Sequence, residues 1–187
     1  MSKWSKKRRG MRRYDQSAKV YDAQYREEQH AKIRTAMDNL TLNRDSIVLD
    51  AGCGTGFLFE HVAEKTKFTI GTDSSRGLLK EAKKKARGYK NIALVLADAD
   101  NMPFANHAFD VVFAITLLQN MPNPVGTLKE IRRVSKSNGP IIVSGLRKAF
   151  TKNDFSEMLK RANLKVVVLR LDQQMREHVA VCFKMSR

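Results

Sequence analysis

Cysteine is scarce in this chain of 187 residues, which contains two of them, Cys53 and Cys182. They lie far apart and neither belongs to a Cys-x-x-Cys pair, so the sequence predicts no zinc site, iron–sulfur cluster or disulfide framework. The four histidines also lack the spacing of metal ligands. We therefore expect no metal.

Long apolar runs are missing as well. The longest, from Val111 to Leu118, is interrupted by Thr116 and is much shorter than a membrane span. No apolar segment follows the basic N-terminus, so the pattern of a secretory signal is absent. We therefore expect a soluble, cytoplasmic protein with no membrane partner.

Acidic residues are outnumbered, with 19 Asp and Glu against 35 Lys and Arg, which gives a formal net charge of +16. Such an excess favours a polyanionic partner, because phosphates neutralised by basic side chains release condensed counterions. A general contribution to solubility is the alternative. Residues 1–13 contain seven basic and no acidic residues, and this charge density predicts a flexible, extended basic arm.

The rest of the chain alternates between strand-like and helix-like segments. Residues 14–40 have the mixed pattern of amphipathic helices. Strands are predicted over 46–50, 68–73, 92–98, 109–116, 140–144, 164–171 and 178–183, and helices over 56–64, 76–87, 124–135 and 153–162. This alternation predicts an α/β domain with a largely parallel sheet covered on both faces. The last two strands have no helix between them, so we expect a terminal hairpin with an antiparallel strand.

A glycine-rich turn, Asp50-Ala51-Gly52-Cys53-Gly54-Thr55-Gly56, follows the first predicted strand. Glycine permits positive φ angles and a close approach of a ligand to the backbone, and open α/β sheets bind ligands at the carboxyl ends of their strands. The dinucleotide fingerprint Gly-x-Gly-x-x-Gly would need glycine where this chain has Phe57. The pattern Asp-x-Gly-x-Gly-x-Gly is instead the one associated with S-adenosylmethionine.

Two further acids end the next two predicted strands. Asp73 has nearly the spacing at which a carboxylate hydrogen-bonds ribose hydroxyls, and Asp98 ends the third strand. One such acid alone is commonly a helix cap. Three acids at consecutive strand ends, with the glycine turn at the first, favour a cofactor site.

These motifs together resemble class I S-adenosylmethionine-dependent methyltransferases. DAGCGTG at 50–56, the acid at 73, ADADNMPF at 97–104 and FDVVFAITLLQNMPNP at 109–124 are similar to motifs I to IV of the quinone-methyltransferase-like group and of small archaeal-type rRNA methyltransferases. The resemblance covers residues 14–145. It implies one Rossmann-like domain over 14–187, with a helical cap over 14–40 and a core over 46–187. It also implies a seven-stranded, mostly parallel sheet of order 3-2-1-4-5-7-6 whose last strand is antiparallel.

The resemblance implies S-adenosylmethionine as cofactor and S-adenosylhomocysteine as product. Asp50 and Gly52 would face the methionine end, Asp73 the ribose diol, Asp98 the adenine amino group and Thr116 the methyl-donor end. The residues expected to contact the cofactor are Asp50, Ala51, Gly52, Cys53, Gly54, Gly56, Asp73, Ser74, Asp98, Ala99, Thr116 and Tyr14.

Candidate catalytic residues come from the segment after the fourth strand and from the helical cap. Many members of the family have a histidine pair where this chain has Gln119-Asn120. Asn120-Met121-Pro122 distantly resembles the (Asp/Asn/Ser)-Pro-Pro-aromatic motif of enzymes that methylate exocyclic base amines, for instance at cytidine N4. We therefore predict Asn120, Gln119, Tyr21 and Pro122 as catalytic. A loop with a proline-defined helix start is the alternative.

RNA is the acceptor that the charge pattern favours. No segment is long enough for a separate substrate domain, so we expect a site that is open to a macromolecule. A structured RNA, above all rRNA or the small ribosomal subunit, can be recognised by its shape and one splayed base. A monomer is favoured. The residues expected to bind RNA are Lys7, Arg8, Arg9, Arg12, Arg13, Arg147, Lys148 and Lys152.

Other functions stay open at this point. A protein-lysine methyltransferase would also use an open site, although a net charge of +16 opposes attraction of a cationic side chain. A small-molecule methyltransferase of the quinone type is disfavoured by the lack of inserted helices. A non-catalytic RNA-binding subunit is disfavoured by the intact glycine turn and its three acids.

Overall fold

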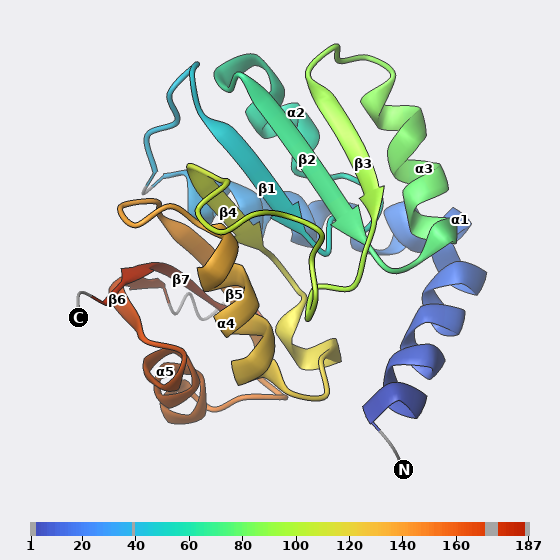
Figure 1. Ribbon diagram of the computed structural model, residues 1–187. Helices are drawn as coiled ribbons and strands as arrows, with labels where there is room; N and C mark the ends of the chain where they lie inside the picture. The colour runs from blue at the N-terminus through green and yellow to red at the C-terminus, as the bar shows by residue number, and fades with distance from the viewer. Residues whose placement is uncertain (1–2, 39, 171–175, 186–187) are drawn as a thin grey trace.

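The computed structural model describes residues 3–38, 40–170 and 176–185. Its seven-stranded sheet has the order β3-β2-β1-β4-β5-β7-β6 (Figure 1). Neighbours from β3 to β5 are parallel, while β7 runs antiparallel to both β5 and β6. The predicted strand order and terminal antiparallel strand are confirmed. The strands are β1 (Ile47–Ala51), β2 (Phe68–Asp73), β3 (Ile92–Leu96), β4 (Val111–Ala114), β5 (Ile141–Leu146), β6 (Leu164–Arg170) and β7 (Glu177–Lys184).

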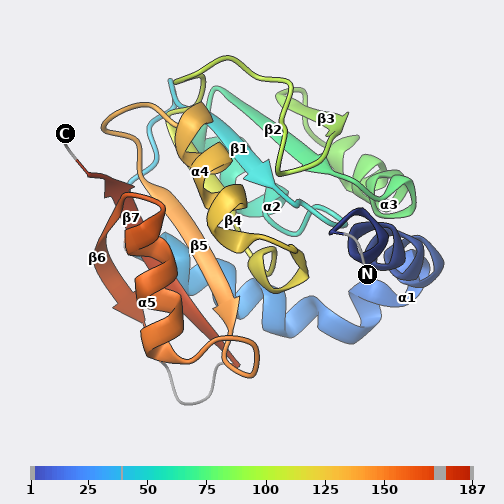
Figure 2. The same ribbon diagram turned by 60° about the horizontal axis from the view of Figure 1, so that its bottom comes forward.

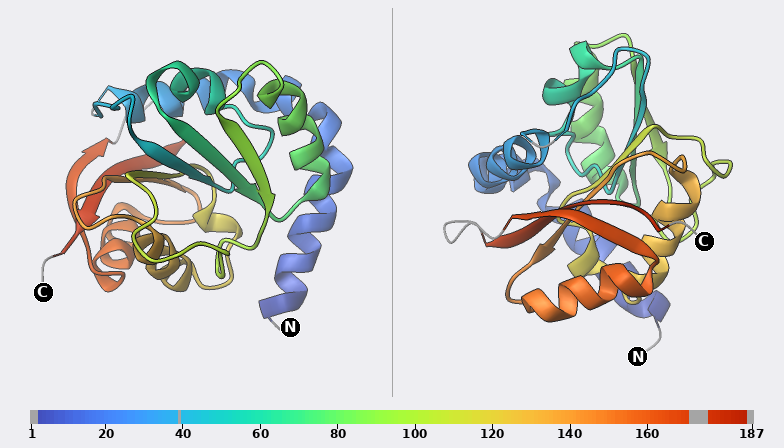
Figure 3. Two further views of the ribbon diagram at one scale, coloured as in Figure 1. Left: turned by 45° about the horizontal axis from the view of Figure 1, so that its top comes forward. Right: turned by 90° about the vertical axis from the view of Figure 1, so that its left-hand side faces the viewer.

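Helices cover both faces of the sheet, and the right-hand view of Figure 3 shows α1 and α5 on opposite sides of β6 and β7. The helices are α1 (Lys3–Met37), α2 (Phe59–Val62), α3 (Arg76–Ala86), α4 (Pro124–Val134) and α5 (Lys152–Arg161). Short 3₁₀ turns, η1 (Ala63–Lys65) and η2 (Leu118–Asn120), follow α2 and β4. No helix in this described part of the chain is long and apolar enough to cross a membrane.

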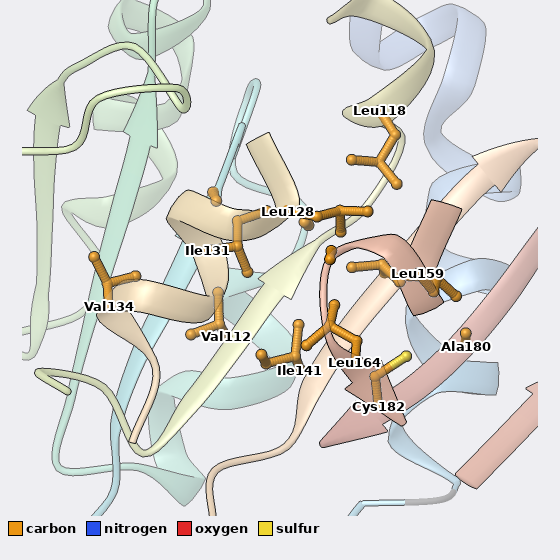
Figure 4. Close-up of a cluster of buried hydrophobic side chains, with 14 of the residues drawn as sticks. Val112, Leu118, Leu128, Ile131, Val134, Ile141, Leu159, Leu164, Ala180 and Cys182 are labelled. Carbon is orange, nitrogen blue, oxygen red and sulfur yellow. The ribbon is translucent and has the colours of Figure 1, made fainter. Parts of the chain in front are cut away.

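The central strands β1, β4 and β5 are buried on both faces. Successive side chains of a strand point to opposite sides of the sheet. Leu49 and Val112 accordingly join Leu128 of α4 in one buried cluster (Figure 4), whereas Val48 and Val111 join residues of α1 and α2 in another. Because neither face of these central strands meets water, their sequences are nearly continuous apolar runs.

α1 is one continuous helix of 35 residues. Residues 3–13 therefore differ from the expectation of an extended arm. Like charges along an isolated helix repel each other, but most helices in proteins are stabilised by tertiary packing. Here Lys7 is ion-paired with Asp98 and Asp100, so acids far away in the sequence offset part of the repulsion.

Leu159 of α5 tests the packing of the larger cluster, because its side chain is 0% exposed. Leu159→Ala should lower the free energy of unfolding by about 2–5 kcal/mol, since it removes buried methyl groups and leaves a cavity. Val20→Ala on α1 is the control, because Val20 is 59% exposed and its truncation should change stability by less than about 0.5 kcal/mol. Urea unfolding measures both variants, and equal losses would contradict this placement of Leu159.

Candidate functional site

A cavity of about 540 Å³ lies at the carboxyl ends of β1, β2 and β3, beside the segment after β4. Residues of the N-terminal turns of α1 and of the segment from Thr116 to Met121 line it. Figure 2 shows α1 beside α3. The fold brings ten of the expected cofactor residues to its wall: Asp50, Gly52, Cys53, Gly54, Asp73, Ser74, Asp98, Ala99, Thr116 and Tyr14.

The glycine turn after β1 shapes one wall of the cavity. Gly52, Gly54 and Gly56 have φ angles of 76°, 55° and 82°, which other residues rarely adopt. A Cβ added to Gly54 would meet no atom within 4 Å, so the backbone there is open to a ligand. A Cβ on Gly56 would lie 2.3 Å from the ring of Phe59. Gly56 and the buried Ala51 do not line the cavity; they support the turn instead of facing the cofactor as expected.

Asp50 is a buried acid at the cavity, with 4% of its surface exposed. Burial, and after it the charge of Asp73, raises the pKa of Asp50 to about 8. No described residue donates a hydrogen bond to its carboxylate. A buried carboxylate without a partner is costly, so this position favours a cationic ligand.

Asp73 connects the glycine turn to the end of β2. Its Oδ2 accepts a hydrogen bond of 3.0 Å from the Gly54 N–H, and its Oδ1 accepts one of 2.8 Å from the Ser75 N–H. Burial raises the pKa of Asp73, although these backbone N–H groups act in the opposite direction. The carboxylate therefore orders the turn and also lies on the cavity wall.

Asp98 carries an ion pair that the sequence did not indicate. The Lys7 Nζ lies 2.7 Å and 2.6 Å from the two oxygens of Asp98, and 2.5 Å from Asp100 Oδ2. The Lys7 side chain is 14% exposed and lines the cavity. The Lys7 ammonium, expected to contact phosphate, is instead ion-paired with two carboxylates at the end of the cavity formed by the loop after β3.

Two acids of α1 attach this helix to the rim of the cavity. Asp15 Oδ1 accepts hydrogen bonds from the Ser75 hydroxyl at 2.5 Å and from the Gly77 N–H at 2.8 Å. Asp22 accepts one from the Thr55 hydroxyl at 2.5 Å and is ion-paired with Lys85 at 2.7 Å. Neither acid was among the site residues predicted from the sequence. Their separation of two helical turns, which places them on one face, was the signal that could have found them.

The predicted catalytic residues divide into two groups. Asn120 and Tyr21 line the cavity, but Gln119 and Pro122 do not. The side-chain amides of Asn120 and Gln119 both donate to the carbonyl of Thr116, at 3.1 Å and 2.9 Å. Tyr21 packs between Tyr14 and Tyr25, and burial raises its pKa, so its hydroxyl is a neutral donor rather than a base.

The remaining predicted RNA-binding residues are exposed and form two groups. Arg8, Arg9, Arg12 and Arg13 follow one another along the N-terminal turns of α1, whose Gly10, Met11 and Tyr14 line the cavity. Arg147, Lys148 and Lys152 lie between the end of β5 and the first residue of α5.

Two histidines far apart in the sequence meet where α1 packs on α2. His30 Nδ1 lies 2.8 Å from His61 Nε2 and 3.2 Å from an oxygen of the exposed Glu60. Two nitrogens on one tetrahedral zinc ion, each about 2.0–2.1 Å from the metal, would be roughly 3.3 Å apart. The shorter separation fits a direct hydrogen bond between a neutral N–H and a lone pair, which attaches α1 to α2.

A family model described as "Methyltransferase domain" matches residues 49–143, from β1 to the middle of β5. The chain belongs to the methyltransferase domain family. The matched region contains cavity-lining residues of the glycine turn, together with Asp73, Asp98, Thr116 and Asn120.

Curated relatives of this methyltransferase domain act on different acceptors. The chain is 31% identical over 148 residues to a malonyl-[acyl-carrier protein] O-methyltransferase of Marinomonas sp., covering 78% of this chain and 54% of that one. It is 36% identical over 119 residues to a demethylmenaquinone methyltransferase of Staphylococcus saprophyticus (62% and 51%). It is 30% identical over 128 residues to a tRNA U34 carboxymethyltransferase of Aliarcobacter butzleri (67% and 42%). The chain spans about half the length of these relatives.

Solved structures of methyltransferases share the fold. A Haloferax volcanii putative methyltransferase, solved in complex with the Trm112 methyltransferase activator, matches with a TM-score of 0.81 at 16% identity, covering 92% of this chain and 98% of that one. An S-adenosylmethionine-dependent methyltransferase from Aquifex aeolicus matches with a TM-score of 0.77 at 17% identity, covering 90% and 97%.

The cavity fits S-adenosylmethionine, the cofactor of this methyltransferase family. Its cationic methionine end suits the buried Asp50, which has no hydrogen-bond donor among the described residues. Gly54 leaves the backbone open for the cofactor, and Asp73 would hold the ribose. When bound, the cofactor supplies a methyl group already activated on a sulfonium, so this chain needs no nucleophile of its own.

Binding of the cationic cofactor should release protons from Asp50. The carboxyl of the free protein is mostly neutral at pH 7, because burial raises its pKa to about 8, and a nearby cation favours the ionised form. Calorimetry at pH 7 in buffers of different ionisation enthalpy should show release of up to about one proton per cofactor. Asp50→Asn should abolish this release and weaken cofactor binding at least about tenfold, or about 1.4 kcal/mol. Equal proton release by the variant would exclude Asp50 as the source.

Asp50 favours cofactor binding, but its ionisation destabilises the folded protein when no cofactor is bound. In the unfolded chain it ionises near pH 3.8, whereas in the folded protein it stays protonated up to about pH 8. The folded state thus binds one more proton in between, and this contribution is lost as pH rises from about 4 to 8. Thermal unfolding at pH 8 should find the cofactor-free Asp50→Asn variant more stable than the wild type. A lower midpoint would contradict the raised pKa.

Proposed function

We propose that this protein transfers a methyl group from S-adenosylmethionine to a base of structured RNA, with rRNA or the small ribosomal subunit as its first candidate. The observation that carries this proposal is the placement of exposed arginines on the helix that lines the cofactor cavity. We call them the arginine face, and its members are Arg8, Arg9, Arg12 and Arg13.

The arginine face has the spacing of a polyanion-binding surface. Arg8 and Arg12 are one helical turn apart, as are Arg9 and Arg13, so the four guanidiniums project from adjacent rows of α1. The intervening Gly10 and Met11 line the cavity. A phosphate backbone held by this face would thus lie about one helix diameter from the cofactor site, roughly 10–12 Å, within reach of a nucleotide splayed from its stack.

A second basic group and one relative support an RNA acceptor. Arg147, Lys148 and Lys152 lie in the exposed segment that follows the carboxyl end of β5. Because β5 is parallel to β4, this segment is at the same end of the sheet as the cavity. The similarity to a tRNA U34 carboxymethyltransferase shows that a related domain occurs in an enzyme named for an RNA substrate.

Asn120 suits an exocyclic base amine as acceptor. Its Nδ2 is committed to the Thr116 carbonyl, which leaves Oδ1 as a hydrogen-bond acceptor at the cavity. A carbonyl oxygen that accepts from the N–H of an aromatic amine withdraws the lone pair from the ring and directs it at the methyl group. Alignment at about 3 Å can supply several kcal/mol of the rate enhancement.

A small-molecule acceptor is the second candidate. Two of the relatives are named for an acyl-carrier protein and a menaquinone precursor, and α1 contributes residues from Lys7 to Ile33 to the cavity wall. A small-molecule acceptor would not contact the arginine face. Removing these arginines should therefore weaken binding of an RNA acceptor but not of a small molecule.

Removal of the arginine face should weaken RNA binding and leave the cofactor bound. Replacing Arg8, Arg9, Arg12 and Arg13 by Gln should reduce the salt dependence of RNA affinity by up to about one log unit per lost phosphate contact. The matched control replaces Lys65, Lys67, Arg87 and Lys90 by Gln, because these residues are exposed and precede the amino ends of β2 and β3, at the end of the strands away from the cavity. RNA titrations at several salt concentrations measure both. Equal slopes for the two variants would remove the support for RNA.

Asn120→Ala should lower the rate of RNA methylation by about 10- to 100-fold, as expected for loss of a hydrogen bond of about 1–3 kcal/mol. Asn101→Ala, at an exposed position, is the control and should keep the wild-type rate. Mass spectrometry of nucleosides from RNA treated with the enzyme should find the methyl group on an exocyclic amine. Methylation only of ring nitrogens or ribose would contradict this acceptor, and methylation of a quinone or acyl carrier instead of RNA would favour the second candidate.

A further inference from the structure

We infer that Thr116 is a positioning residue for methyl transfer. A buried polar cluster, whose members belong to none of the sequence motifs described above, holds the backbone of Thr116 in an unfavourable conformation. The cluster consists of Gln29 and Lys32 of α1, Ser144 of β5 and Glu177 of β7. This inference rests on the proposed function, because the groups that Thr116 orients include Asn120.

The backbone of Thr116 is strained. Its φ is 60°, in the left-handed region that β-branched residues rarely enter. Such outliers persist where the surrounding structure determines them, and they gather at functional sites. Thr116 lies between the end of β4 and the η2 turn, at the cavity wall.

Residues of the buried cluster form hydrogen bonds with both the backbone N–H and the side-chain hydroxyl of Thr116. Its N–H donates to Ser144 Oγ at 2.7 Å. Its hydroxyl lies 3.2 Å from Gln29 Nε2, from Lys32 Nζ and from Glu177 Oε1. A hydroxyl donates once and accepts twice, so it accepts from the amide and the ammonium and donates to the carboxylate.

Glu177 and Lys32 form the charged centre of this cluster. Lys32 Nζ lies 2.7 Å from Glu177 Oε1, and Ser144 Oγ donates a short hydrogen bond to Glu177 Oε2. Lys32 is 1% exposed, while Ser144 and Glu177 are fully buried. A buried ion pair is costly unless further partners complete it. Here Ser144 and Thr116 supply hydrogen bonds, and Glu28 Oε1 lies 2.8 Å from Lys32 Nζ.

The cluster determines the direction in which the backbone carbonyl of Thr116 points. The Thr116 carbonyl accepts from Gln119 Nε2 at 2.9 Å and from Asn120 Nδ2 at 3.1 Å. It thereby fixes which end of each amide is the oxygen. A Thr116 that relaxed to negative φ would turn this peptide group, and the Oδ1 of Asn120 would lose its orientation at the cavity.

Thr116→Val tests this inference, because it keeps the shape of the side chain and removes the hydroxyl. We expect kcat for RNA methylation to fall at least tenfold, while the Kd of the cofactor and the KM for RNA change less than threefold. Thr116→Ser should recover at least a third of the wild-type kcat, because it restores the hydroxyl. The control is Thr69→Val, which removes a buried hydroxyl near the start of β2 and should leave kcat unchanged.

The charged centre is tested by a double variant that removes both of its fully buried charges. The Glu28 carboxylate, which lies 2.8 Å from Lys32 Nζ, loses this partner but is 33% exposed to water. Lys32→Met with Glu177→Leu should fold and bind cofactor, since hydrophobic replacement of a buried pair is commonly tolerated, yet it should show the same fall in kcat. Wild-type kcat in this variant or in Thr116→Val would overturn the inference, as would an equal loss in Thr69→Val.

A spectroscopic measurement separates this inference from the proposed function. The side-chain amide signals of Gln119 and Asn120 in ¹⁵N–¹H spectra, assigned with Gln119→Ala and Asn120→Ala, should be sharp in the wild type and shifted or broadened in Thr116→Val. If the wild type methylates no RNA, the proposed function fails while these signals still test the positioning. Unchanged amide signals in Thr116→Val would overturn the inference.

Discussion

Polar attachments at intervals along α1 hold this helix across the carboxyl edge of the sheet, and the cavity depends on them. Lys7 meets the loop after β3, Asp15 the N-terminus of α3, Asp22 the glycine turn and Lys32 the start of β7. Single exposed pairs contribute little to stability. Together, the four attachments determine the register of α1 on the sheet. A helix advances 1.5 Å per residue, so a shift of one residue would displace every attachment.

Charges of opposite sign are separated between the exterior of the protein and its site. The net charge is +16, yet the cavity wall carries Asp50, Asp73 and Asp98. Asp50 and Asp73 favour a cationic cofactor inside, while the exposed arginines of α1 are the surface that we propose for a polyanion. One helix presents both surfaces, since Met11 and Tyr14 face the cavity and their neighbours Arg12 and Arg13 are exposed.

Structural features that depend on a few consecutive residues could be predicted from the sequence. The strand order followed from a family resemblance carried by the glycine turn at 50–56 and the strand-end acids, and the fold has that order. Lys7 shows where such reasoning fails. In the sequence it is one cation of a basic run, and nothing near it indicates that its partners, Asp98 and Asp100, are 91 or more residues away. The extended arm was wrong for the same reason.

The sequence by itself determined the family, the cofactor and the positions of the acids at the strand ends, because these reside in local motifs whose backbone conformation glycine and strand termini dictate. Only the tertiary structure decided which amides point at the cavity. Gln29, Lys32, Ser144 and Glu177 come from three separate elements, and they act on Thr116 together because packing removes water from between them. Hydrogen bonds of this kind form only after the chain is folded, so no local pattern records them.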